Sequence, residues 1–87
     1  MSTVLITHEV DDVEHWVSSP RRNELFPALG ITHRTFVDPE ASHLVGIVAE
    51  IPDLDAFQEW LGTAGAQEAM THDGVRPDTI RMLIASP

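Results

Sequence analysis

The chain has no cysteine and no lysine, and these absences exclude several classes of function. Its 87 residues include 14 Asp+Glu against five arginines, which gives a formal net charge of -9. Without cysteine, the protein can hold neither a disulfide nor a thiolate-bound metal. Five cations among so many carboxylates cannot neutralise a run of phosphates, so we expect binding neither to nucleic acid nor to an anionic membrane surface.

Long hydrophobic runs are also missing. The first apolar run, residues 4–6, is short and follows no basic residue, so we expect no signal peptide. No stretch has the length needed to span a bilayer, and these features predict a cytoplasmic protein. The length allows a single domain, residues 1–87, that buries only roughly 60–65% of its unfolded surface. We therefore expect a stabilising partner, most simply a second copy of the chain.

Four segments have the pattern of strands: residues 4–10, 31–37, 44–51 and 79–85. Apolar side chains alternate along the first, second and fourth segments, as in strands with one buried face. The third is apolar nearly throughout, which predicts a central strand. Two helical segments separate them. In the first, Asp11 with Glu14 resembles a capping box, Ser19-Pro20 predicts a restart, and Gly30 predicts the end.

The second helical segment begins after Pro52 with Asp53 as the expected N-cap. Gly62 and Gly65 are expected to interrupt it, and Gly74 to end it. The element order is then βαββαβ, an α+β ferredoxin-like arrangement. Right-handed connections predict four antiparallel strands in the order 4-1-3-2 with both helices on one face.

The face of the sheet away from the helices is expected to be too apolar to remain in water. We expect it to cover the same face of a second chain, closing two sheets into a dimeric α/β barrel. Arg34, Glu50 and Arg81 share this parity, which favours an ion pair at the interface or, alternatively, a clamp for a substrate carboxylate. The apolar residues of this parity are Leu5, Phe36, Leu44, Val48 and Leu83.

Several motifs resemble the dimeric α/β-barrel superfamily, and more narrowly its antibiotic-biosynthesis-monooxygenase-like and small cyclase-type members. They are His8-x-Val10-x-Asp12-Val13-x-x-Trp16, Gly30-Ile31-Thr32, Asp53-Leu54-Asp55-Ala56-Phe57 and Glu68-Ala69-Met70-x-x-x-Gly74-Val75-x-x-x-x-Ile80. The resemblance implies a dimer and a site for a small aromatic or polyketide-like molecule. It covers cofactor-free monooxygenases, cyclases and isomerases, and also haem-degrading enzymes.

The chain departs from what this resemblance implies for catalysis. The quinone-forming monooxygenases are expected to use tryptophan and asparagine around an apolar cavity, but here the sole asparagine, Asn23, lies within the first helical segment. The haem-degrading branch is expected to bind haem through a helix histidine, for which His72 is a candidate. A histidine near a helix end is also favoured by the helix dipole alone.

Two histidines are the candidate catalytic residues. His8 and His33 have the parity that faces the helices. We expect the first strand to run parallel to the third, so that both histidines flank Ala49 and Ile51, about 10 Å apart. Such imidazoles could act as general acid and base, and the alternative is that each is a core histidine bonded to a backbone carbonyl.

The expected walls of this pocket are Trp16, Ala49, Phe57, Trp60 and Met70, which could equally be ordinary core. His15 and His43 are expected on the surface. The acidic residues Glu9, Asp11, Asp12 and Glu14 could attract a hard cation, but a solvated helix N-terminus accounts for them. We therefore predict no metal site and no cofactor.

Three functions remain open. The first is a cofactor-independent monooxygenase, or a cyclase or isomerase, in which an inward histidine removes a proton. The second is a non-catalytic dimeric module for ligand binding or assembly, which predicts a closed interior. The third is haem or metal binding through a histidine.

Overall fold

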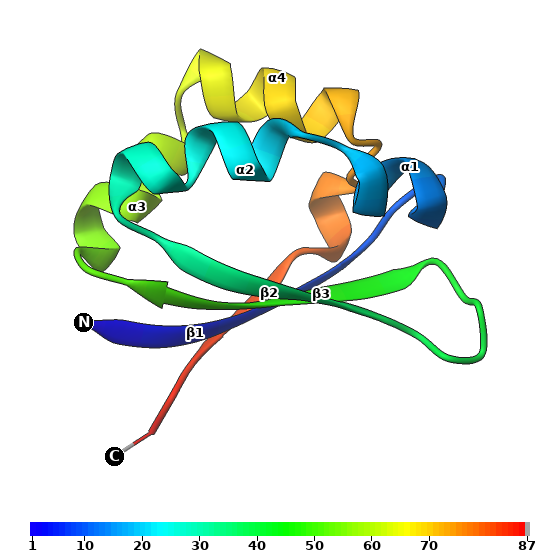
Figure 1. Cartoon of the computed structure of the whole chain (residues 1–87), viewed down its shortest axis with the longest axis horizontal. Helices are drawn as coiled ribbons and strands as arrows, with labels where there is room; N and C mark the ends of the chain where they lie inside the picture. Colours follow the sequence, from blue (N-terminus) through cyan, green and yellow to red (C-terminus); the bar gives the residue numbers. More distant parts are fainter. Residues whose placement is uncertain (87) are drawn as a thin grey trace.

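The computed structural model describes residues 1–86 and places every helix on one face of a single sheet (Figure 1). The helices α2 and α4 lie side by side above the sheet, and the loop between β2 and β3 projects from one end. The strands are β1 (Ser2–Glu9), β2 (Thr32–Val37), β3 (Leu44–Ile51) and β4 (Arg81–Ile84). The helices are α1 (Val13–Ser18), α2 (Arg21–Leu25), α3 (Leu54–Leu61) and α4 (Ala64–His72), with short 3₁₀ turns η1 (Pro27–Leu29) and η2 (Pro77–Thr79).

The sheet confirms the predicted ferredoxin-like order, since its strands run β2-β3-β1-β4. All three neighbouring pairs are antiparallel. The prediction that the first and third strands are parallel is therefore wrong. The helical crossover between β1 and β2 makes these two strands parallel, and β3 lies between them, antiparallel to both.

The parity of the strands is as the alternating pattern predicts. Val4, Ile6 and His8 of β1 point toward the helices and are buried. In β3, Val45, Ile47, Ala49 and Ile51 are buried with them. On the opposite parity, the outer face carries the exposed side chains of Leu5, Phe36, Leu44 and Leu83. The core thus lies wholly between the sheet and the helices.

Local signals place most helix ends correctly, with three shifts. Asp12, not Asp11, caps α1, because its Oδ1 accepts a hydrogen bond from the backbone N–H of His15 at 3.2 Å. Asp53 caps α3 as predicted, and Gly62 ends it. Gly65, in contrast, lies within α4, whose N-cap is Thr63. The final strand starts late because η2 occupies the residues before it.

Gly30 is the residue whose conformation the connection into β2 requires. It adopts a left-handed backbone, with φ of 71°, directly after the 3₁₀ turn η1. Only glycine enters this region at little cost, so it ends the helical segment as the sequence predicts. No helix among residues 1–86 is long and apolar enough to cross a membrane.

Candidate functional site

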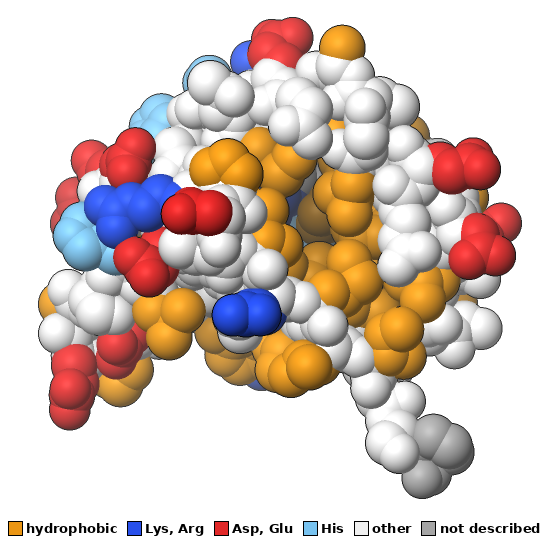
Figure 2. All heavy atoms as spheres, turned by 180° about the vertical axis from the view of Figure 1, so that it is seen from behind, with side chains coloured by type: hydrophobic (Ala, Val, Ile, Leu, Met, Phe, Trp, Pro, Cys, Tyr) orange, Lys and Arg blue, Asp and Glu red, His pale blue; other side chains and the backbone are white. Residues whose placement is uncertain are grey.

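A cavity of about 240 Å³ lies between the sheet and the helices. Figure 2 shows the hollow from behind, with hydrophobic side chains around its opening. A purely structural module would fill this interior with side chains, but here it is open. The residues that line it are Ile6, His8, Trp16, Arg21, Arg22, Leu25, Phe26, Ile47, Phe57, Trp60, Leu61, Ala66, Gln67, Ala69, Met70, Asp73, Val75, Ile80 and Met82.

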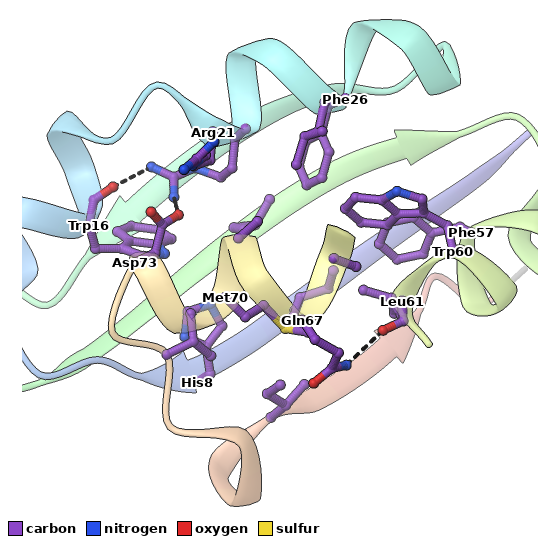
Figure 3. Close-up of a pocket in the computed structure, with 18 of the residues that line it drawn as sticks. His8, Trp16, Arg21, Phe26, Phe57, Trp60, Leu61, Gln67, Met70 and Asp73 are labelled. Carbon is purple, nitrogen blue, oxygen red and sulfur yellow. Dashed lines mark hydrogen bonds and ion pairs between the residues drawn. The ribbon is translucent and has the colours of Figure 1, made fainter. Parts of the chain in front are cut away.

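Five of the seven predicted site residues line this cavity. Four of them are the predicted walls Trp16, Phe57, Trp60 and Met70, which Figure 3 shows around it, and the fifth is His8. Phe57 and Trp60 come from α3 and stack with ring centroids 5.9 Å apart. They form an aromatic wall at the opposite end of the cavity from His8.

His33 and Ala49 are not among the residues that line the cavity. The error follows from strand direction. Because β1 and β3 are antiparallel, His8 lies opposite Val45, whereas His33 lies opposite Ala49, four residues further along β3. The two histidines therefore do not bracket a ligand. His33 instead packs its half-buried ring edge-to-face against Phe26, with centroids 5.0 Å apart.

His8 has one ring nitrogen free for chemistry. Its Nδ1 lies 3.4 Å from the carbonyl oxygen of Glu9, and because a carbonyl only accepts, Nδ1 carries the proton. Nε2 then holds the lone pair and has no hydrogen-bond partner among residues 1–86. Every side-chain nitrogen or oxygen that is fully inaccessible in this part of the chain has a partner, so Nε2 is accessible, and His8 is one of the residues that line the cavity.

The surroundings of His8 keep its imidazole neutral. Burial lowers its pKa below the ordinary value, and the nearby positive charge of Arg22 lowers it further. The hydrogen bond to Glu9 and the charge of Asp73 raise the pKa, but they do not reverse the direction. A neutral imidazole with a free lone pair is suited to accept a proton at neutral pH.

The lowered pKa predicts a loss of stability in acid. Below pH of about 6.5 the unfolded chain protonates His8 while the folded chain does not, so the free energy of unfolding falls until the folded pKa is reached. Urea denaturation at pH 7.5 and pH 5 should show this fall. In the His8→Phe variant, which keeps an aromatic ring beside Trp16, the fall should be smaller. An equal fall in both proteins would contradict the prediction.

A buried polar wall that the sequence did not reveal stands beside His8. Arg22 donates from one guanidinium nitrogen to the Trp16 carbonyl at 2.6 Å and from the other to Asp73 Oδ2 at 3.4 Å. Asp73 Oδ1 accepts from the hydroxyl of Ser19 at 2.5 Å. The Arg22 guanidinium also lies 4.1 Å from the Trp16 ring centroid. This wall places a buried ion pair, Arg22 with Asp73, at a cavity whose lining is otherwise mostly apolar.

The other polar candidates have ordinary partners. Arg76 pairs with Glu9 at 2.8 Å and with Asp11 at 2.9 Å, so two of the four acidic residues near α1 are engaged by an arginine. On the outer face, Glu50 accepts from Thr3 at 2.8 and 2.9 Å. Arg34 lies 5.4 Å from the Phe36 ring centroid. The predicted clamp for a carboxylate therefore stays a prediction.

Comparisons with known proteins place the fold. No family model matches the sequence, and no curated protein matches it. A crystal structure described as an antibiotic biosynthesis monooxygenase matches with a TM-score of 0.64 and 15% identity over 100% of this chain and 98% of that chain. A putative antibiotic biosynthesis monooxygenase from Deinococcus radiodurans matches with a TM-score of 0.60 and 16% identity, covering 100% of this chain and 92% of that one.

A third structure is a dimeric ferredoxin-like protein of unknown function from Jannaschia sp. CCS1. Its TM-score is 0.63 at 16% identity, over 99% of this chain and 98% of that chain. At such low identity these similarities establish the fold and not the activity. The chain has the ferredoxin-like fold of antibiotic-biosynthesis-monooxygenase-like structures, as the sequence motifs predict.

Proposed function

We propose that the chain binds a small, largely apolar aromatic molecule in the cavity and that His8 Nε2 removes an acidic proton from it. The observation that carries this proposal is a neutral, buried imidazole with one unpartnered nitrogen, accessible from an apolar cavity. The cavity is slightly smaller than the about 300–1,000 Å³ typical of ligand sites. It therefore suits a ligand of one or two rings.

The chemistry needs no cofactor for its first step. A C–H beside a carbonyl, or a phenolic O–H, gives its proton to His8 Nε2 and leaves an enolate or phenolate. The resulting imidazolium stabilises that anion in a site of low polarity. Return of the proton to another carbon completes an isomerisation. Attack of the anion on an internal carbonyl forms a carbon–carbon bond and an alkoxide, and return of the proton from His8 to that alkoxide completes a cyclisation.

A monooxygenase reaction also needs no cofactor. The electron-rich anion reduces O₂, a ring CH₂ becomes C=O, and the second oxygen atom leaves as water. The similarity to structures described as antibiotic biosynthesis monooxygenases favours this outcome over the alternatives. Haem binding through His72 is a weaker candidate, because the cavity does not include His72 among its lining residues.

Proton abstraction can be tested without knowing the natural substrate. We suggest 2-tetralone, a two-ring ketone with an acidic C–H, in deuterated buffer, with exchange followed by NMR. The protein should accelerate exchange, and His8→Gln should slow the catalysed rate by about 10²–10⁴-fold. His33→Gln is the matched control, since that histidine also faces inward but does not line the cavity. Exchange at the buffer rate, or equal exchange by His8→Gln, would remove the proposal.

We further propose that the chain is a homodimer through its outer face. Leu83 is 61% exposed and Leu44 48%, next to Leu5 and Phe36, so an extended apolar surface faces away from the helices. The register places Leu83 opposite Leu5 and Leu5 opposite Val48, which makes a continuous apolar row across three strands. A second copy of the same face would remove this row from water.

Light scattering after size exclusion tests the dimer. The wild-type chain should be dimeric at micromolar concentration, and Leu83→Glu should weaken the dimer by about a hundredfold or more, because a twofold interface meets the buried charge twice. Val17→Glu is the control, since Val17 is 48% exposed but lies on α1. A wild-type monomer, or a dimer unaffected by Leu83→Glu, would contradict the proposal.

A further inference from the structure

A second cluster of chemically active side chains joins two histidines outside the cavity to Asp73 at its wall. His15 of α1 and His72 at the end of α4 are 57 residues apart in the sequence, yet His15 Nε2 lies 2.7 Å from the His72 carbonyl oxygen. Their ring centroids are 5.2 Å apart. Asp73 adds a carboxylate beside them, and one potential ligand atom from each of the three lies within 4.8 Å of the other two.

We propose that His15, His72 and Asp73 bind a divalent transition-metal ion of the Zn²⁺ class. Two imidazole nitrogens and one carboxylate oxygen form a donor set that suits Zn²⁺, Co²⁺, Ni²⁺ and Cu²⁺. Mg²⁺ and Ca²⁺ prefer sites made of oxygen ligands, which this cluster does not supply. Neither histidine lines the cavity, and Asp73 is the one residue that the metal site shares with it.

The hydrogen bonds around the cluster are those that metal-binding histidines commonly make. A carbonyl only accepts, so the bond from His15 Nε2 to the His72 carbonyl leaves the lone pair of His15 on Nδ1. His72 Nδ1 lies 3.0 Å from Asp73 Oδ1, so an ion held by these two atoms would replace the proton between them. The bond of His15 to the carbonyl fixes its tautomer before a metal ion arrives.

Asp73 is held in place more firmly than a surface carboxylate would be. It is buried, and it accepts hydrogen bonds from Ser19 and Arg22 as well as from His72. The carboxylate therefore offers a fixed point against which two mobile rings can close. Both histidines are exposed, so their rings can turn without disturbing the core.

The cluster must contract to bind the ion. Metal–ligand distances of about 2.0–2.1 Å in a tetrahedral site place ligand atoms roughly 3.3 Å apart. The potential ligand atoms are now up to 4.8 Å apart, so they must come about 1.5 Å closer to one another. Rotation of the surface histidine side chains can provide this movement. The remaining position would face solvent and hold water. The ion would then join α1 to the end of α4.

Binding of Zn²⁺ alone is the direct test. Protein produced without a histidine tag and freed of metal by a chelator should bind one Zn²⁺ per chain in calorimetry. When Co²⁺ is bound in place of Zn²⁺, its visible absorption should be that of an ion with a low coordination number. At a Zn²⁺ concentration of about 100 Kd, the Tm should rise by roughly 10 °C, because only the folded chain assembles the three ligands.

Two variants and one control locate the ion. His15→Gln and His72→Gln should each weaken Zn²⁺ binding at least about tenfold, with the fold checked by circular dichroism. His43→Gln should bind as the wild type does. Its Nδ1 also lies 2.8 Å from a backbone carbonyl, that of Val10, but His43 is not part of the cluster.

Several results would overturn the metal site. These are no Zn²⁺ binding by the wild type, unchanged binding by His15→Gln, equal loss in His43→Gln, or Mg²⁺ binding as tightly as Zn²⁺. In any of these cases the cluster is a network of hydrogen bonds that ties α1 to α4, and nothing more.

Discussion

Asp73→Ala is expected to lower the free energy of unfolding by about 3–5 kcal/mol, because it leaves a buried cation without its partner. Asp73 is 4% exposed and Arg22 is 8% exposed. The carboxylate accepts from Arg22 and also from Ser19, so its removal leaves both donors without a bond. For a chain of this length, whose whole stability is about 4–13 kcal/mol, such a loss approaches complete unfolding.

Urea denaturation followed by circular dichroism measures this loss. The midpoint for Asp73→Ala should fall by more than about 1 M, and Asp73→Asn, which keeps hydrogen-bonding atoms but removes the charge, should lie between it and the wild type. Should Asp73→Ala not fold, Asp73→Asn alone carries the measurement. A midpoint unchanged in Asp73→Asn would show that the charge of Asp73 does not matter.

A second substitution separates the unpaired charge from lost packing. Arg22→Met combined with Asp73→Ala removes both charges and keeps an apolar chain beside Trp16. The double variant should be more stable than Asp73→Ala alone, because no uncompensated guanidinium stays buried. If the double variant lost as much free energy of unfolding as the two single variants lose together, Arg22 and Asp73 would not be energetically coupled.

The features that the sequence predicted are those with a local signal. The alternation that includes Val4, Ile6 and His8 fixes which face of β1 is buried, and Asp53 caps α3 with its own side chain. Gly30 marks a left-handed end that few other residues tolerate. Each of these depends on neighbours within a few residues, so one sequence is enough to predict it.

The features that were missed depend on contacts between distant segments. Arg22 and Asp73 are 51 residues apart, and neither has a pattern that predicts burial of a charge. His15 and His72 meet only because α1 packs beside the end of α4. The error over the histidine pair was topological: one wrong strand direction placed His8 beside Ala49, whereas it lies opposite Val45, and His33 lies opposite Ala49 as predicted.

Trp16→Ala is the other substitution with a large expected effect, a loss of about 3–5 kcal/mol in the free energy of unfolding. Trp16 is 1% exposed. Its ring meets His8 edge-to-face with centroids 5.6 Å apart, and the Arg22 guanidinium lies 4.1 Å from its centroid. Removing the indole would enlarge the cavity beside the candidate base, His8. It would also leave the Arg22 guanidinium next to an empty space in place of the ring.

Trp60→Ala is the matched control, because it removes the same side chain from the other end of the same cavity. Trp60 is only half-buried, so its loss should destabilise the chain less than the loss of Trp16. Trp60→Ala should weaken the apparent affinity for 2-tetralone more than Trp16→Ala does, since it opens the aromatic wall formed with Phe57. Trp16 would then support the position of His8, and Trp60 would hold the ligand. Equal urea midpoints for the two alanine variants would contradict this division, because the fold would then draw no more stability from the buried tryptophan than from the one at the rim.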